Sequence, residues 1–149
     1  LATPGEPSLV FAGYRFRTEA SALDHLDAEL GLRTTRLELT DPRYYHLDTC
    51  LCPLGDGRAL VVAGAFSAPS MRALAEAFDD LIAVTPEDAA RFACNALVVG
   101  EHVVLNGGCA TTERALRDRG LTPVPSPTDE FLKSGGSVKC LVLQLDAFV

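Results

Sequence analysis

The sequence predicts a mixed α/β fold in which a strand–helix unit is repeated along the chain. Three short apolar runs begin such units: Val10–Gly13, Val61–Gly64 and Val103–Asn106. Each run is followed by a polar stretch and a helix with an Ala-Leu pair, and this Leu lies 10 positions beyond the end of the run. The units are therefore about 40 to 50 residues long, within the range of repeated supersecondary structures.

In the first unit, apolar spacing predicts a helix from about Glu19 to Leu30, with Gly31 as its stop. The residues expected to share its apolar face are Ala22, Leu23, Leu26 and Leu30. The run Arg36–Leu39 follows as a short strand. This order of strand, helix and strand sets the pattern for the rest of the chain.

In the second unit, a helix is expected from about Pro69 to Phe78, followed by a strand over Leu81–Val84. Thr85 then has the features of an N-cap, with Pro86 at the first helical position of a short helix. These elements repeat the order of the first unit and add one short helix.

The third unit begins with a predicted hairpin over Ala96–Leu105, which turns at Gly100 and Glu101. A helix is expected from about Thr111 to Arg119, with Gly120 as its C′ residue, and the run Leu121–Val124 follows. No long linker divides the chain, so residues 1–149 are interpreted as one domain.

Composition excludes several classes of protein. The formal net charge of −7 argues against a nucleic-acid partner, which usually requires basic patches. No apolar run is long enough to predict a transmembrane helix, so no membrane association is expected. The odd number of cysteines, five, favours free thiols in a reducing compartment, and we expect a cytoplasmic protein. No glycine-rich nucleotide motif is present, and no cofactor is expected.

Two segments contain residues suited to covalent catalysis. Cys140 follows a Gly-Gly pair and precedes an apolar run, which predicts an exposed thiol at the start of a strand. His46 and Asp48 lie two apart in a run that resembles a strand, so both side chains would point to one side. The alternatives are a cysteine packed as a small hydrophobic residue and a histidine that is only structural.

Other patterns are weaker. Cys50 and Cys52 form a Cys-x-Cys pair, which lacks the spacing of zinc sites, so no metal is expected. Arg15 and Arg17 would share a side if their segment were extended, and could then bind a carboxylate. An exposed basic edge is an equally good interpretation of this pair.

With these residues in view, the chain resembles the superfamily of guanidine-modifying amidinohydrolases and amidinotransferases, which includes dimethylarginine dimethylaminohydrolase and arginine deiminase. The matching segments occur in the family's order and cover nearly the whole chain. They are Gly13–Thr18, His46–Thr49, Phe92–Ala96 and Glu130–Cys140. The histidine and cysteine motifs together make this resemblance fairly specific.

The resemblance implies a pentein fold, an α/β propeller of five ββαβ modules around a central site. About three of the five modules are found in this sequence. The family's acidic Glu-Gly-x-x-Asp motif would fall at or before Leu1. We therefore expect residues 1–149 to be a partial pentein domain, the C-terminal portion of a longer family member. The missing N-terminal segment, or a second chain, would complete the site.

The resemblance also implies a role for each candidate residue. Cys140 would attack the guanidinium carbon, and His46 would act as general acid and base. Asp48 would bind guanidinium nitrogens, Arg17 the substrate carboxylate, and Ser134 would contribute to substrate binding. The expected substrate is a small guanidino compound, arginine or an Nω-methylated arginine, with citrulline as product.

Three alternatives remain open at the level of sequence. An amidinotransferase differs only in the nucleophile that resolves the covalent intermediate. A non-catalytic fragment could retain the fold and bind a guanidino ligand without turnover. A small structural α/β protein could contain Cys140 and His46 by chance, in which case the two side chains would lie far apart.

Overall fold

The computed structural model describes residues 2–3 and 6–144. The strands in these residues are β1 (Ala2–Thr3), β2 (Glu6–Tyr14), β3 (Arg33–Glu38), β4 (Leu51–Gly55), β5 (Arg58–Val61), β6 (Asp80–Ala83), β7 (Leu97–Val99), β8 (His102–Asn106) and β9 (Thr122–Ser126). The α-helices are α1 (Ala20–Leu30), α2 (Ala68–Ala77), α3 (Pro86–Ala90), α4 (Ala110–Arg117) and α5 (Asp129–Leu132). Short 3-10 helices are η1 (Leu47–Thr49), η2 (Ala63–Ala65) and η3 (Lys139–Leu141).

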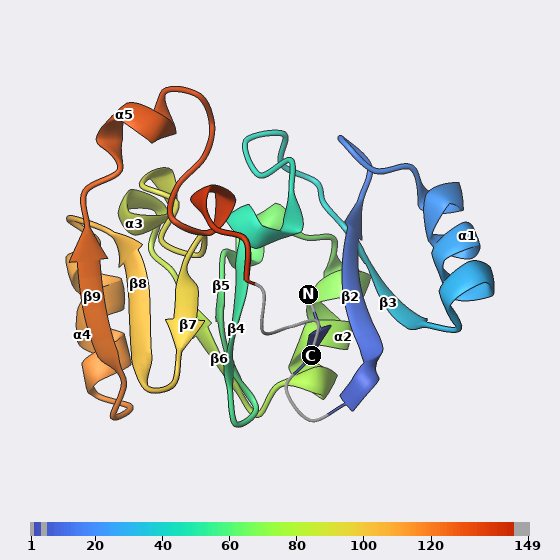
Figure 1. The fold of residues 1–149 in the computed structure, drawn as a ribbon, viewed down its shortest axis with the longest axis horizontal. Coiled ribbons are helices and arrows are strands. Elements are labelled where there is room, and N and C mark those ends of the chain that lie inside the picture. Colours follow the sequence, from blue (N-terminus) through green and yellow to red (C-terminus); the bar gives the residue numbers. More distant parts are fainter. Residues whose placement is uncertain (1, 4–5, 145–149) are drawn as a thin grey trace.

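The strands form three sheets of three strands each within the described part of the chain, in the orders β1-β2-β3, β4-β5-β6 and β7-β8-β9. In every sheet the first two strands are antiparallel, and the third is parallel to the second. The crossover to the third strand contains α1, α2 or α4. Each sheet therefore belongs to a ββαβ unit, and the three units lie side by side in Figure 1. The mixed α/β fold and its repeats agree with the sequence prediction.

Local sequence explains where the elements begin and end. The Thr85 side chain accepts a hydrogen bond from the Asp88 backbone N–H, as expected for the N-cap of α3. Gly31 adopts φ 62° at the C-cap of α1, where the helix was predicted to stop. The predicted helix end at Arg119 was two residues too late, because α4 ends at Arg117 and a tight turn leads to Gly120.

One hairpin was not predicted. β4 and β5 are joined through Asp56 and Gly57, which both have positive φ, 49° and 71°. Two successive residues of this kind match the type I′ turn that connects tightly paired strands. The Asp-Gly pair is the strongest local signal for such a turn, so the sequence did contain the information.

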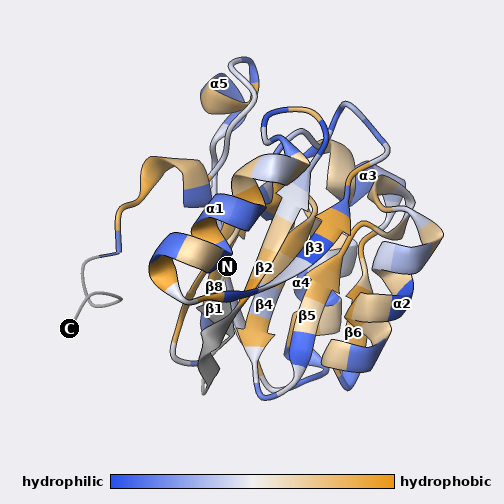
Figure 2. Ribbon diagram, turned by 90° about the vertical axis from the view of Figure 1, so that its right-hand side faces the viewer, coloured by the Kyte–Doolittle hydropathy of each residue, from blue (hydrophilic) through white to orange (hydrophobic). Residues whose placement is uncertain are grey.

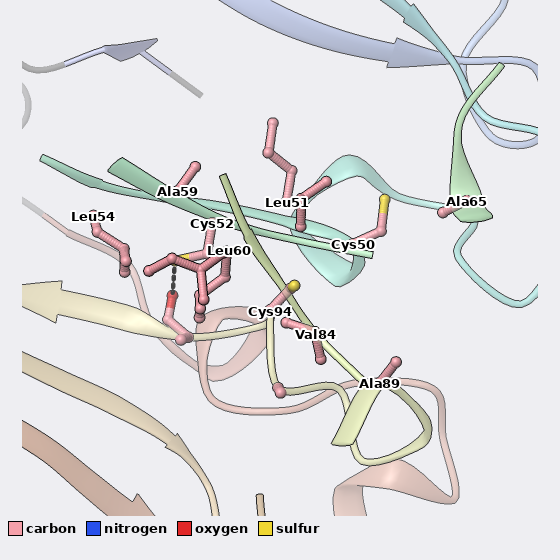
Figure 3. Packing of buried hydrophobic residues seen from close by; sticks show 14 of the residues in the cluster. Cys50, Leu51, Cys52, Leu54, Ala59, Leu60, Ala65, Val84, Ala89 and Cys94 are labelled. Atoms are coloured by element: carbon pink, nitrogen blue, oxygen red, sulfur yellow. Dashed lines mark hydrogen bonds between the residues drawn. The ribbon is translucent and has the colours of Figure 1, made fainter. Parts of the chain in front are cut away.

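The hydrophobic core includes residues of all three sheets and of α2, α3 and α4. The apolar residues of β5 and β6 appear as orange segments in Figure 2. Cys50, Cys52 and Cys94 are packed among the side chains of this core (Figure 3). The predicted apolar face of α1 was partly wrong, because only Leu23 of that helix is buried. Leu26 and Leu30 remain 40% and 62% exposed.

Two site segments differ from the predicted strands. Residues 45–46 form a loop that leads into η1, and hydrogen bonds from Thr49 N to His46 O and from Cys50 N to Leu47 O close this turn. Cys140 lies within η3, and residues 142–144 are not in a strand. The apolar run after Cys140 was therefore misinterpreted, because its backbone is not paired in a sheet. No helix among the described residues is long and apolar enough to span a bilayer.

Candidate active site

The loop before η1 and the segment before η3 meet at one cavity, although about ninety residues separate them. This cavity, of about 330 Å³, is lined by four of the residues selected from the sequence: Arg17, His46, Ser134 and Cys140. Tyr45 and the two glycines before Ser137 complete much of its wall. The structure thus places the Cys140 thiol and the His46 imidazole in the lining of one cavity, and a catalytic interpretation depends on this arrangement.

His46 and Asp48 both line a second cavity, beside Gly13 and Leu47. Strand geometry predicted that these two side chains point to one side and Leu47 to the other. The segment instead forms the turn of η1, and Leu47 lines the same cavity. Asp48 Oδ2 is 3.8 Å from Cys140 Sγ, so the carboxylate reaches the thiol directly.

The Asp48 carboxylate is incompletely satisfied. Within the described part of the chain, its Oδ1 atom is buried and has no hydrogen-bond partner. A buried acceptor without a donor is costly, and such an atom is a natural site for a ligand that brings N–H groups. A guanidinium group presents donors in the planar geometry that a carboxylate binds.

Cys140 is exposed and is held by the side chain of Asn95. Its N–H donates to Asn95 Oδ1 at 3.3 Å, and the Asn95 side-chain amide donates to Cys140 Sγ at 3.3 Å. A Cβ on Gly136 would come within 3.2 Å of Cys140 Cβ, so the chain approaches the thiol closely because this residue has no side chain.

The Tyr45 side chain joins two of the segments that line the cavity. Its hydroxyl donates to the Gly135 carbonyl, joining the glycine-rich loop to the segment before His46. Arg17 lies over the Tyr45 ring, with its guanidinium carbon 5.6 Å from the ring centre. The structure thereby places an exposed cation at the rim of the cavity, where it can meet an anionic group.

The hypothesis that Arg15 and Arg17 act together was wrong. Their segment is bent, with Arg15 N bonded to Thr18 O, and Arg15 has a positive φ of 120°. Arg15 instead pairs with Glu38 at 2.9 Å, away from the cavity. Only Arg17 of the pair lines the site.

The remaining cysteines are buried. Burial raises the pKa of Cys52 to about 12 and that of Cys109 to about 12. Burial also raises the pKa of Cys50 and Cys94 well above the ordinary range. These four thiols are suited to packing rather than to nucleophilic chemistry. Among the described residues, no group of three or more His, Cys, Asp or Glu side chains is arranged to bind a metal ion.

Sequence reasoning missed two residues of the site, Tyr45 and Asn95. Asn95 is a fully buried polar residue within the apolar run from Ala93 to Val99. A polar residue at such a position usually has a specific hydrogen-bonding role, so this signal was available. Tyr45 had no comparable signal, because its partner is a backbone carbonyl ninety positions away.

Comparison with solved structures first defines the class of protein. The chain superposes on the N-terminal domain of ArgZ bound to product, an arginine dihydrolase of cyanobacteria, with a TM-score of 0.85 and 38% identity. The match covers 89% of this chain and 50% of that one. SxtG, an amidinotransferase from Microseira wollei, shares the fold with a TM-score of 0.77 at 20% identity, over 89% of this chain and 43% of that one. The mixed α/β fold is thus of the pentein type.

Sequence comparison then identifies the family. Residues 6–147 match the family described as N,N dimethylarginine dimethylhydrolase, eukaryotic, and the chain belongs to this dimethylarginine dimethylaminohydrolase family. It is 43% identical over 136 residues to N(G),N(G)-dimethylarginine dimethylaminohydrolase of Mycobacterium tuberculosis. It is 38% identical over 138 residues to the bifunctional arginine dihydrolase/ornithine cyclodeaminase AgrE of Nostoc sp.. These matches cover 91% of this chain but 45% and 20% of the two relatives.

Proposed function

We propose that this chain forms the cysteine–histidine part of a hydrolase that acts on the guanidino group of arginine or an Nω-methylated arginine and releases citrulline. The main support is that Cys140 and His46 line one cavity, with the Asp48 carboxylate 3.8 Å from the sulfur. Family membership agrees with this chemistry, and related ArgZ structures include one covalently bound to a reaction intermediate. The five free thiols support a reducing compartment such as the cytoplasm.

The proposed reaction has two steps. The Cys140 thiolate attacks the guanidinium carbon, a C–S bond forms, and the C–N bond to the departing amine breaks while His46 protonates that nitrogen. His46 then removes a proton from water, which attacks the same carbon. The C–S bond breaks, the thiolate is regenerated, and a ureido product remains.

Binding of the substrate is divided among three side chains. The unpartnered Oδ1 of Asp48 accepts guanidinium N–H groups and orients the carbon toward sulfur. Arg17, exposed at the rim, binds the substrate carboxylate, and Ser134 contacts the substrate from the glycine-rich loop.

A mutational assay tests this function. Citrulline formation from arginine and from dimethylarginine is measured in the full-length protein that contains this chain. We expect Cys140→Ser and His46→Ala to abolish activity, whereas His102→Ala, which changes an exposed histidine of β8, leaves it unchanged. Arg17→Ala should raise KM by about 10-fold or more, whereas Arg15→Ala should not. Full activity of Cys140→Ser would refute the proposal.

We also propose that the site is completed by a segment outside these residues, an N-terminal portion or a second chain, within a five-module propeller. The chain spans half of the ArgZ domain it matches. Several large apolar side chains near Cys140 are exposed and would be covered by such a segment: Phe131, Leu141, Val142 and Leu143.

Sedimentation of the isolated chain tests this partner. We expect it to self-associate, or to pair with a separately produced N-terminal half, because the apolar surface near Leu143, which is 75% exposed, favours contact. Addition of that half should restore citrulline formation. A monodisperse monomer with full activity would contradict the proposal of a completing segment. Calorimetry on the completed protein is a separate test, and binding of arginine without turnover would indicate a binding protein instead of an enzyme.

A further inference from the structure

Asn95 is a fully buried polar side chain beside the sulfur, and the mechanism above gives it no role. It lies just after α3, where Phe92 adopts φ 56°. A bulky residue rarely adopts this left-handed conformation, and such strain persists only where the surrounding structure enforces it. The backbone is therefore strained at Phe92, three residues before Asn95.

Hydrogen bonds use both ends of the Asn95 side chain. Oδ1 accepts the N–H groups of Ser137 at 3.0 Å and Cys140 at 3.3 Å. Nδ2 donates to the Asp48 carbonyl at 3.3 Å and to Cys140 Sγ at 3.3 Å. Because two backbone donors face Oδ1, the opposite orientation of the amide would place N–H against N–H. The contacts therefore fix an N–H that points at the sulfur.

We propose that Asn95 is a positioning residue, which joins the Cys140 segment to the His46–Asp48 turn and donates a hydrogen bond that favours the Cys140 thiolate. A donor to the charged form of an acid stabilises that form. The catalytic meaning of this bond rests on the proposed function, whereas the bond itself does not.

Other charges also act on the thiol. Cys140 Sγ donates to Asp48 Oδ2 at 3.8 Å, and the cationic Arg17 lines the same cavity. Tyr45 and His46 also line this cavity, and Lys139 precedes Cys140 in η3. On α5, Lys133 is paired with Glu130 at 2.7 Å. Since Asn95→Ala leaves all these groups in place and adds no charge, a shift of the alkylation midpoint in that variant can be assigned to the lost donor.

The test is the pH dependence of Cys140 alkylation by iodoacetamide, followed by mass spectrometry. In Asn95→Ala and Asn95→Asp, we expect the midpoint of the alkylation profile to rise by about one to two pH units. Asn95→Asp retains an acceptor for the two backbone N–H groups but also adds a negative charge beside the sulfur. Asn95→Ala removes the donor without adding a charge, so its midpoint is the decisive one. The matched control is Asn106→Asp, since Asn106 is also fully buried between backbone groups, but bonds to Thr128 N and Arg91 O.

A purely structural role would lower the stability of both Asn95 and Asn106 variants without moving the midpoint in either, and that result would overturn the inference. If the Asn95 variants do not fold, the unmutated chain is used. The side-chain amide signal of Asn95 in ¹⁵N NMR should then follow the ionisation of Cys140 with the midpoint of the alkylation profile, and an unchanged signal would overturn the inference.

Alkylation requires no turnover, so the two proposals can fail separately. A shifted midpoint in a protein that forms no citrulline would sustain the role of Asn95 and reject the proposed function. Normal citrulline formation in the unmutated protein, together with an unchanged midpoint in the Asn95 variants, would sustain the proposed function and reject the role of Asn95.

Discussion

At the scale of single residues, exposure and burial separate one thiol from four others. Cys140 is exposed at the cavity, whereas Cys50, Cys52, Cys94 and Cys109 are buried. Burial disfavours the charged thiolate because it removes the charge from water, and it raises the pKa of each buried thiol. Nucleophilic chemistry is therefore directed to a single cysteine by its environment.

This difference predicts the order of thiol modification. At pH 8, iodoacetamide should alkylate Cys140 on the order of 1000-fold faster than Cys52 or Cys109, since a thiol with a pKa of about 12 contains very little thiolate at that pH. Peptide mass spectrometry over a time course measures the rates. In Cys140→Ser, no rapidly modified site should remain, and equal rates at all five thiols of the unmutated chain would contradict the assignment.

At the scale of elements, the glycine-rich loop between α5 and η3 determines where the thiol lies. Gly135 has φ 79°, and a Cβ at this position would collide with the Tyr45 hydroxyl, which donates to the same residue's carbonyl. Both the backbone conformation and the close contact therefore require glycine. The Tyr45 hydroxyl thus connects this loop to the segment of His46.

Substitution of this glycine tests the loop. Gly135→Ala should destabilise the chain by more than the roughly 1 kcal/mol expected from φ strain alone, because Tyr45 must also move. It should also slow the alkylation of Cys140 and the formation of citrulline. The matched control is Gly31→Ala, at φ 62° with no neighbouring atom within 4 Å of the added Cβ. Denaturant unfolding of both variants gives the comparison, and equal losses would argue against the Tyr45 contact.

At the scale of the whole molecule, the second and third units are joined by side-chain contacts as well as by the chain. Arg119, after α4 of the third unit, donates to Asp80 at the start of β6 in the second, with Nε to Oδ2 at 2.5 Å. Arg58 of β5 donates to the Arg119 carbonyl at 2.9 Å. Hydrogen bonds to Arg119 lower the pKa of Asp80, so this pair links stability to pH.

The sign of that pH dependence follows from the direction of the shift. The pKa of Asp80 is lower in the folded state, so its contribution to stability is present above the unfolded-state pKa and is lost as the pH falls through the folded-state value. Asp80→Asn should lower the free energy of unfolding by at most about 1 kcal/mol at pH 7, because the pair is partly exposed.

Urea unfolding at several pH values measures this effect. The difference between Asp80→Asn and the unmutated chain should begin to shrink near the unfolded-state pKa, at about pH 4, and should disappear below the lower folded-state pKa. Asp56→Asn is the control, since Asp56 is 90% exposed in its pair with Arg58 and should contribute little at any pH. A difference that persists at low pH would show that the pair acts through packing rather than charge.

The sequence by itself determined the repeated strand–helix order, the Thr85 cap and the hairpin turning at Gly100, because these depend on local apolar spacing and turn chemistry. It also indicated Cys140 and His46 as a possible pair. It could not show that both line one cavity, since that depends on how separate units pack.

Only the tertiary structure decided the conformation of the two site segments and the importance of Asn95 and Tyr45. The run around His46 alternates like a strand, but it pairs with no strand among the residues that the structure describes and closes into η1 instead. Asn95 and Tyr45 act through partners that are 45 and 90 positions distant in the chain. Contacts over such distances are fixed by the packing of the three sheets, and no local pattern in the sequence specifies them.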